Sequence, residues 1–441
     1  MFQIGASNAV SCIARRDVPT TAHDLEEGFN AALADCLRTA SLDQPDQLLA
    51  SCSAKGGLGI VAVGLVQELT LKAAREAACS AGGKILGDYA GLLSEGDVEE
   101  MARTQADIIL FSGGTERGNR DYVLHNARML AQLDPASVEI VYAGNSALTL
   151  EVRRILSAFS LHTARNIMPT INVLDIESAR EMIRTIFLQK IIHGKGLDAL
   201  SARVRGEILP TPLSIYRFVQ NLYERQTLEG PFLLLDPGGA TTDIYSASPV
   251  VLPGSGVLYR GMAELEVKRS VEGDLGMRFH GLTTDARFAQ RIAQQPTALP
   301  QSESEADAER ETARQCVREA ILRHAGMQRT VWTPEGPMTI QTGKDLRAVH
   351  LIIGSGGYLG RAVDAGFYTD CLDATAAGPA TDCAVPLLPK PTEVYGDHQH
   401  LLPLVALLST CKPMAAAIHF KHSLHRLPHH VERKELCLGH A

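Results

Sequence analysis

Short apolar runs alternate with helical stretches between residues 58 and 160, and this alternation restricts the fold more than any other feature of the chain. Buried parallel strands read as continuous apolar runs, and the helices between them supply right-handed crossovers. The pattern therefore predicts an α/β protein with a doubly wound, Rossmann-like unit over residues 58–165. The runs expected to be its strands are Gly59–Val63, Lys84–Leu86, Asp107–Phe111 and Val138–Tyr142.

Composition divides the rest of the 441-residue chain into four further segments. Residues 1–57 are expected to form an N-terminal lobe that starts with a shortened hairpin, and residues 166–230 a mostly helical connector. A second α/β lobe is expected over residues 231–411, with a helix near 308–324 and a hairpin near 330–340. Residues 412–441 form a histidine-rich tail.

Charge and hydropathy exclude two classes of partner. The chain has 42 Lys and Arg against 50 Asp and Glu, so it lacks the clustered basic excess that nucleic-acid binding needs. No apolar run approaches the roughly 18 residues of a membrane span, and the first residues lack the pattern of a signal peptide. We therefore expect a cytoplasmic protein that binds neither nucleic acid nor membrane.

The cysteines and the terminal histidines do not form a recognisable metal or disulfide pattern. The nine cysteines include no Cys-x-x-Cys pair, so we expect most to be reduced and buried. On a helix, His419, His422 and His425 could share a face as metal ligands. Because chain ends are commonly loose, we favour a partly ordered tail instead.

The segment Leu233–Ser246 carries the strongest chemical motif. An apolar run delivers Asp236 into a turn that contains Gly238, Gly239, Thr241 and Thr242, and Asp243 then opens a second β-type run. Glycines let backbone amides approach an anion, threonine hydroxyls add donors, and an aspartate at a strand end can hold hydrated Mg²⁺ or orient water. An ordinary hairpin would explain the glycines but not the two flanking acids, so we interpret the motif as a phosphate-binding loop.

A second glycine turn follows the apolar run Leu351–Ile353, and its glycines are Gly354, Gly356 and Gly357. Such turns are common by themselves, but this one follows the first motif by about 115 residues, as expected of an adenosine-binding turn in the same lobe.

A first phosphate hairpin could lie at the N-terminus. There Gly5 and Ser7 would contact the nucleotide, and Gln3 stands at the acidic position. Because glutamine is neutral, it would be a poor partner for Mg²⁺ at that place.

Two further glycine-containing segments have open interpretations. Ser112–Asn119 follows an expected strand and opens a helix, where ligands of doubly wound sheets and anions bind. Gly144 and Asn145 follow the next strand at the same edge, which favours a shared rim. A tight strand-to-helix connection would explain the first segment equally well. The stretch Val271–Arg278 could be either a loop or a site.

These motifs resemble those of known families. Asp-x-Gly-Gly-x-Thr-Thr-Asp together with Gly-x-Gly-Gly resembles the actin, Hsp70 and sugar-kinase ATPase superfamily. More narrowly, the order of motifs between about Pro19 and Leu408 resembles the glutamate mutase accessory family (MutL/GlmL, unrelated to mismatch repair). The motifs that carry this narrower resemblance are Val63–Thr70, Ser112–Asn119, Ala143–Asn145, Asn166–Pro169 and Arg269–Gly276.

The resemblance implies an actin/Hsp70-like two-lobed ATPase that binds ATP and Mg²⁺. Asp236 would be the catalytic and metal-binding residue, the glycines and threonines of its turn would hold the β- and γ-phosphates, and the second glycine turn would lie under the adenosine. The implied partners are the subunits of an adenosylcobalamin-dependent mutase, either glutamate (methylaspartate) mutase or a related aminomutase. The protein would act like a chaperone that promotes release of damaged cobalamin.

The sequence leaves three points open. The cobalamin-ligating Asp-x-His-x-x-Gly sequence is absent, so contact with the mutase protein is favoured over ligation of the corrinoid by a histidine. A small-molecule kinase of the same superfamily is one alternative function. An assembly factor that no longer hydrolyses ATP is another, which the glutamine at position 3 keeps open.

Overall fold

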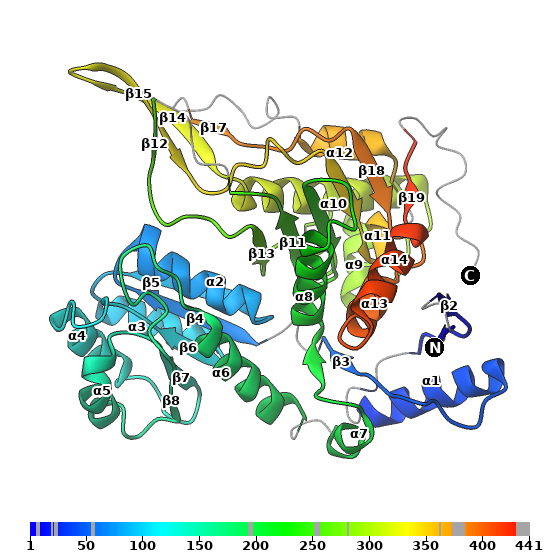
Figure 1. Cartoon of the computed structure of the whole chain (residues 1–441), viewed down its shortest axis with the longest axis horizontal. Helices are drawn as coiled ribbons and strands as arrows, with labels where there is room; N and C mark the ends of the chain where they lie inside the picture. Colours follow the sequence, from blue (N-terminus) through cyan, green and yellow to red (C-terminus); the bar gives the residue numbers. More distant parts are fainter. Residues whose placement is uncertain are drawn as a thin grey trace.

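The computed structural model describes residues 1–5, 9–18, 21, 25–53, 58–192, 197–250, 256–279, 282–360, 363–372 and 384–428. In these residues the chain forms a five-stranded, a six-stranded and a four-stranded sheet, together with two small two-stranded sheets. Helices cover the two larger sheets (Figure 1). The predicted α/β class is therefore confirmed.

The five-stranded sheet is entirely parallel and forms the α/β unit on the left of Figure 1. Its strand order is β5-β4-β6-β7-β8, so the chain changes direction across the sheet between β4 and β6. The strands are β4 (Gly59–Gly64), β5 (Lys84–Ala90), β6 (Ile108–Phe111), β7 (Glu139–Tyr142) and β8 (Leu161–Thr163). The helical elements are η2 (Gln67–Leu71), α2 (Lys72–Ser80), α3 (Glu95–Thr104), α4 (Asp121–Leu130), η3 (Ser146–Leu148), α5 (Thr149–Ile155), α6 (Glu177–Phe187) and η4 (Leu188–Ile192).

Both faces of this sheet are buried, as its continuous apolar strands require. Ile60 and Ala62 of β4 join a core with residues of α2 and α6. Val61 and Val63 point to the other face and join a core with α3, α4 and α5. Successive side chains of a strand alternate between faces, so one apolar strand serves two helix layers. The predicted doubly wound unit is therefore present.

The six-stranded sheet has the order β13-β11-β10-β16-β18-β19. β10 and β11 form an antiparallel hairpin, β13 extends it antiparallel to β11, and β16 and β18 lie parallel to β10. The strands are β10 (Phe232–Pro237), β11 (Thr242–Ala247), β13 (Val267–Glu272), β16 (Leu351–Gly354), β18 (Glu393–Gly396) and β19 (His425–Arg426).

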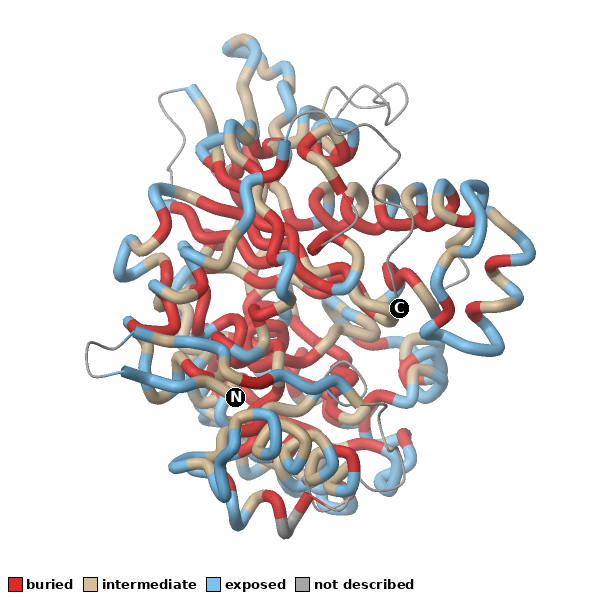
Figure 2. The backbone as a smooth tube through the Cα atoms, turned by 90° about the vertical axis from the view of Figure 1, so that its right-hand side faces the viewer, coloured by how far each residue is buried: buried red, intermediate tan, exposed pale blue. Residues whose placement is uncertain are grey.

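Helices also cover both faces of the six-stranded sheet. α8 (Thr211–Glu224), α13 (Leu402–Leu408) and α14 (Pro413–Ser423) pack on the face that contains Leu234 and Tyr245. α10 (Glu303–His324) and α12 (Ala365–Leu372) pack on the face that contains Leu235 and Ile244. Figure 2 shows buried backbone in the interior of the molecule and exposed residues mostly at its periphery. The remaining helices of this half are α9 (Ala286–Gln294) and α11 (Gly356–Leu359).

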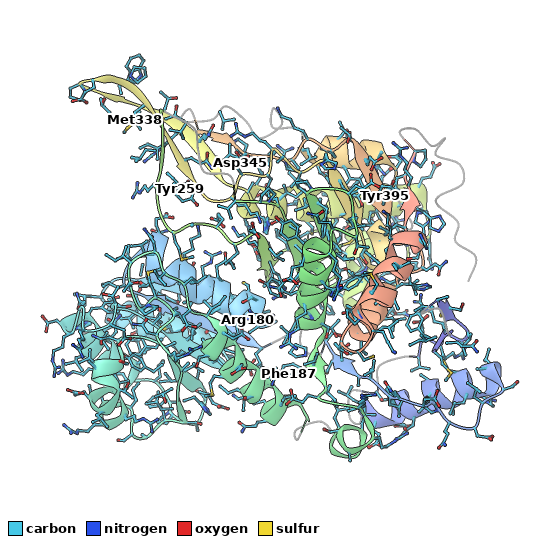
Figure 3. The ribbon with its side chains drawn as sticks, viewed as in Figure 1. Arg180, Phe187, Tyr259, Met338, Asp345 and Tyr395 are labelled. Carbon is cyan, nitrogen blue, oxygen red and sulfur yellow. The ribbon has the colours of Figure 1, made fainter. Side chains whose placement is uncertain are left out.

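The four-stranded sheet projects from the body (Figure 1). Its order is β12-β15-β14-β17, and the β14–β15 hairpin contains the predicted turn near residue 335. Trp332 near the hairpin tip is 82% exposed. Met338 and Tyr259, which belong to this sheet, are labelled in Figure 3. The strands are β12 (Val257–Tyr259), β14 (Met327–Thr333), β15 (Gly336–Thr342) and β17 (Ala384–Pro386).

The N-terminal segment forms two small sheets. β1 (Phe2–Ile4) pairs only with β2 (Val10–Cys12), and β3 (Ser51–Cys52) pairs with β9 (Leu209–Pro210). Phe2 packs against His419 of α14 at 5.7 Å between ring centroids. The described residues before 58 thus do not form a large sheet of their own, and the predicted two-lobed arrangement and domain boundaries stay predictions. Two helices complete this region, α1 (Leu25–Ala40) and α7 (Asp198–Arg203).

Two composition-based expectations can be compared with the described residues. No helix among them is both long and apolar enough to cross a membrane. All seven described cysteines are free thiols, as expected, but only Cys79, Cys316 and Cys371 are buried. The expectation that most cysteines are buried was wrong for this part of the chain, because the others lie on small peripheral elements or near the surface.

Candidate functional site

The β10–β11 hairpin places the two predicted acids opposite each other. Asp236 pairs with Asp243 across the antiparallel ladder, so both side chains leave the same face of the sheet. The Gly238 amide donates to the Thr241 carbonyl over 2.8 Å and closes the turn between them. The predicted phosphate motif is thus a tight hairpin at the end of a buried strand.

The segment that follows β13 stabilises this turn through backbone hydrogen bonds. The amides of Met277 and Arg278 donate to the carbonyls of Gly238 and Gly239 over 3.0 and 2.8 Å. A Cβ on Gly276 would lie 2.5 Å from the carbonyl carbon of Ala240, so only glycine fits there. The Val271–Arg278 stretch, which the sequence left open, therefore acts as the platform of the hairpin turn.

The second predicted glycine turn meets the first at Asp236. β16 lies parallel to β10 with Gly354 beside Leu235, and the Ser355 amide donates to the Leu235 carbonyl over 2.8 Å. Gly356 has a φ of +82°, and a Cβ there would lie 2.6 Å from Oδ1 of Asp236. Both the backbone angle and this close approach require glycine. The two glycine turns, which lie more than a hundred residues apart in the sequence, therefore meet at the carboxylate of Asp236.

The acids at this edge influence one another. Burial, followed by the charges of Asp243 and Asp397, raises the pKa of Asp236 to about 7, and Arg269 partly opposes the shift. Asp397 is fully buried after β18 and accepts hydrogen bonds from the Ser355 hydroxyl and from two amides at the start of α13. Its bond to Ser355 fixes the start of the second glycine turn beside Asp236.

The threonines predicted to hold phosphate are already engaged. The Thr242 hydroxyl is buried and donates to the Leu275 carbonyl over 2.6 Å. The Thr241 hydroxyl donates to Oδ2 of Asp243 over 3.4 Å. In this conformation Thr242 stabilises the platform, and a contact between its hydroxyl and a ligand stays a prediction.

The predicted glycines outside the hairpin lie in different settings. Gly357 is exposed, and a Cβ there would meet no atom within 4 Å. Gly354 is buried, and a Cβ there would collide with the hydroxyl of Tyr368. Gly5 closes the turn of the separate β1–β2 sheet by donating to the Ala9 carbonyl over 2.9 Å. Ser7 lies outside the described residues, so the first phosphate hairpin stays a prediction.

The contrast between Gly354 and Gly357 gives a matched prediction. Gly354→Ala should lower the free energy of unfolding by about 1–3 kcal/mol, because the added methyl group overpacks the core against Tyr368. Gly357→Ala should change it by less than about 0.5 kcal/mol or stabilise α11 slightly. Denaturant unfolding of both variants measures the difference. Equal stability of the two variants would contradict the packing argument.

The predicted rim of the α/β unit is also assembled. The Arg117 amide donates to the Asn145 side chain over 3.1 Å, and Asn166 donates to the Gly114 carbonyl over 3.0 Å and to Glu116 over 2.9 Å. The loops that follow β6, β7 and β8 therefore form one hydrogen-bonded edge, where doubly wound sheets place ligands. In the described residues these bonds link the loops to one another.

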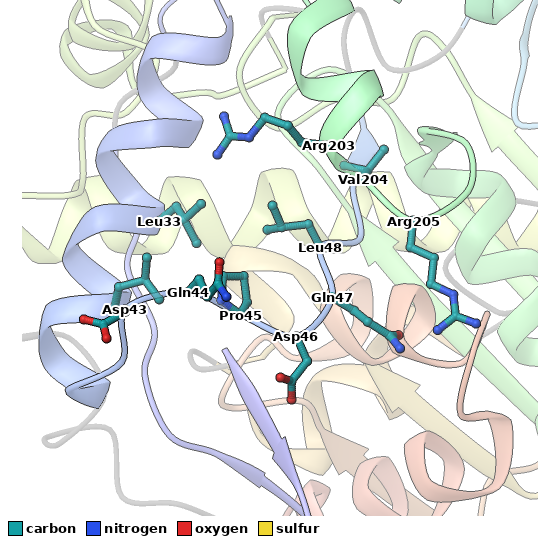
Figure 4. A pocket seen from close by; sticks show the side chains of 11 residues that line it. Leu33, Asp43, Gln44, Pro45, Asp46, Gln47, Leu48, Arg203, Val204 and Arg205 are labelled. Atoms are coloured by element: carbon teal, nitrogen blue, oxygen red, sulfur yellow. The ribbon is translucent and has the colours of Figure 1, made fainter.

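No group of three or more His, Cys, Asp or Glu among the described residues is placed to hold a metal ion. His419 and His422 lie on α14, whereas His425 lies on β19, so the three do not share a helix. A cavity of about 580 Å³ lies apart from the hairpin, between α1 and residues 203–205 (Figure 4). None of its lining residues belongs to the predicted site.

No sequence pattern indicated a role for Arg269 and Asp397, two residues that organise the acidic edge formed by Asp236 and Asp243. Arg269 opens the motif Arg269–Gly276, but a charged residue in a β-type run does not reveal that it is buried. Asp397 directly follows β18, and Asp236 is the next-to-last residue of β10. No strand was expected at this place from the sequence, so Asp397 had no signal comparable to that of Asp236.

The fold and this edge define an α/β protein with a candidate anion and cation site at the carboxyl end of a mixed sheet. Comparison with known proteins specifies the family. A family model described as "MutL protein" matches residues 3–424. Protein MutL of Clostridium tetanomorphum is 34% identical over 431 residues, which cover 90% of each chain. The chain belongs to the MutL family, as its motifs predicted.

Proposed function

We propose that this chain is an ATP-dependent accessory protein of an adenosylcobalamin-dependent mutase, namely glutamate mutase or a related aminomutase. It would reactivate or protect that enzyme by promoting release of damaged cobalamin. Membership of the MutL family supports an accessory role in general. The observation that carries the nucleotide-dependent part is the meeting of the two glycine turns at Asp236, with the Gly356 Cβ position 2.6 Å from its carboxylate.

The residues present suit a magnesium ion. Mg²⁺ is usually held by one or two protein carboxylates, with substrate phosphates and waters completing its shell, so a three-residue cluster is not required. Desolvation, followed by the charges of Asp243 and Asp397, raises the pKa of Asp236, and a cation would relieve that repulsion. Asp236 would hold the ion, and Asp243 would contribute to its field. The bound ion would neutralise charge on a phosphate tail.

The residues around Asp236 also suit a polyphosphate. The space beside Gly357 is free, and neither Gly238 nor Gly239 carries a side chain of its own that would keep a phosphate from the hairpin backbone. Gly356 brings the second turn close enough to the first for one ligand to touch both. Asp236 would orient the attacking water, and the platform under the hairpin would keep its amides fixed.

Cofactor release requires that the ATP-bound and ADP-bound forms differ in affinity for the mutase. Only such a difference in affinity allows ATP hydrolysis to change how tightly the protein binds its partner. We propose that the mutase binds to the α/β unit. The loops that follow β6, β7 and β8 lie outside the nucleotide site, and hydrogen bonds join them into one surface. Contact would be with the mutase protein.

The test starts from glutamate mutase inactivated by bound cyanocobalamin. Adding this protein, ATP, Mg²⁺ and fresh coenzyme should restore mutase activity, and Asp236→Asn should abolish the effect. Asp17→Asn, at an exposed aspartate paired with Arg15, is the matched control and should behave as the wild type. ATP consumption that ignores the mutase would favour a kinase instead. Nucleotide binding without turnover, even with the mutase present, would favour an assembly factor.

A further inference from the structure

Arg269 joins the acidic end of the hairpin to the α/β unit. Its side chain is completely buried in β13, and its Nε donates to Oδ1 of Asp243 over 2.8 Å. The same guanidinium donates to the backbone carbonyls of Cys79 and Gly83, the latter over 3.0 Å. These carbonyls flank the turn between α2 and β5. One side chain therefore contacts the candidate site and the neighbouring unit.

The position of Arg269 makes this contact a connection between two sheets. β13 is the edge strand of the six-stranded sheet, and α2 of the α/β unit lies against it (Figure 1). The Cys79 carbonyl that accepts from Arg269 also accepts from the Gly82 amide over 3.0 Å. Arg269 and an amide of the α2–β5 turn therefore share one acceptor.

Arg269 also interacts electrostatically with Asp236, because its charge opposes the rise in the pKa of that carboxyl. Two carboxylates, Asp236 and Asp243, attract one buried guanidinium, and buried charges are weakly screened. Neutralising Asp236 removes one attraction toward the hairpin. A divalent cation at Asp236 goes further, because it repels Arg269 toward Cys79 and Gly83. Both changes should strengthen the bonds between Arg269 and the α2–β5 turn.

We propose that Arg269 is a positioning residue that couples the charge state of the Asp236 edge to the α2–β5 turn of the α/β unit. For nucleotide this coupling rests on the proposed function, whereas for a substitution at Asp236 it does not. Since coupling between sites is reciprocal, a partner that alters this turn also alters the affinity for Mg-nucleotide by the same factor. The hydrogen bonding of the α2–β5 turn thereby depends on whether a ligand is bound at Asp236.

Hydrogen–deuterium exchange of the full chain tests this coupling, read at the amides of residues 81–84. Asp236→Asn should slow their exchange by about fivefold or more in the wild-type background and leave it unchanged in Arg269→Lys. Lysine retains the positive charge but lacks the planar fork that reaches both sides. Lys72→Gln is the matched control. It removes another ion pair between α2 and the second half of the chain, to Glu264, and should preserve the response to Asp236→Asn.

A second arm adds Mg-ATP to the wild type and to Arg269→Lys, with binding followed by calorimetry. We expect protection of residues 81–84 in the wild type, and binding without that protection in the variant. Absence of heat with the wild type would overturn the proposed function but not the coupling measured with Asp236→Asn. An equal response to Asp236→Asn in both backgrounds, or none in either, overturns the coupling. If Arg269→Lys does not fold, Asp243→Asn breaks the same connection at its other end.

Discussion

Asp236→Asn is expected to raise the free energy of unfolding above neutral pH, by about 1–3 kcal/mol at about pH 8.5, while reducing ATP turnover by at least about 100-fold. The stability gain follows from the raised pKa of Asp236, since the folded protein holds an ionised carboxylate beside two others. Asparagine has nearly the same shape and no charge. The loss of turnover follows from the proposed role of the same carboxylate in holding the metal and the water.

The pH dependence of the stability gain identifies its cause. The pKa of Asp236 is about 7 in the folded protein and near 3.8 when unfolded, so between these values the folded state binds more protons. Wild-type stability should therefore fall as pH rises through this window, and the penalty is complete above about pH 7. The advantage of Asp236→Asn should be largest above this pH and disappear near pH 4.

Thermal or denaturant unfolding at several pH values measures the stability gain, and phosphate release measures turnover. Asp17→Asn again serves as the control, because that aspartate is 83% exposed at its side chain. An equal gain at every pH would show that titration of Asp236 is not the cause. Unchanged turnover in a folded Asp236→Asn variant would contradict the assignment of this residue.

Local patterns in the sequence were sufficient to predict four strands of the α/β unit, two hairpins and the helix near residues 308–324. The apolar runs that became β4, β6 and β7 are almost entirely buried, as expected of continuous apolar runs in a sheet covered by helices on both faces, whereas β5 at the edge is only half-buried. The hairpin of β10 and β11 was predictable because its turn residues lie next to one another in the chain. The hairpin of β14 and β15 was predictable for the same reason.

Contacts between distant segments were harder to predict. The sequence suggested that two glycine turns serve one ligand, but it could not show that Gly356 touches Asp236, because this depends on the parallel pairing of β10 with β16. The same limit applies to Asn145 and Asn166, which both bond to the loop after β6 only because β6, β7 and β8 lie side by side. Short apolar strands such as β1 carry no pattern that specifies which sheet they join.

Buried charge was the feature that the sequence concealed most completely. Arginine is rarely fully buried unless paired, so composition and periodicity place Arg269 on the surface by default. Its burial depends on three acceptors that come from α2, the following turn and β11. Only the folded structure brings those acceptors together, so the role of Arg269 could not be inferred from the sequence.

Arg269→Met is expected to lower the free energy of unfolding by about 3–5 kcal/mol, because it leaves the Asp243 carboxylate without its buried partner. The carbonyls of Cys79 and Gly83 also lose a donor. Adding Asp243→Asn to this variant should recover about 1–3 kcal/mol, since the uncompensated charge is then removed.

Arg323→Met provides the matched comparison in denaturant unfolding. Arg323 pairs with Glu272 and Asp274 on the segment that follows Arg269, but its side chain is 42% exposed. Its replacement should therefore cost less than about 1 kcal/mol. A similar cost for both arginines would mean that burial does not strengthen the Arg269 connection. Non-additive recovery by Asp243→Asn in Arg269→Met, but not in Arg323→Met, would instead assign the energy to the pair that joins the acidic edge to the α/β unit.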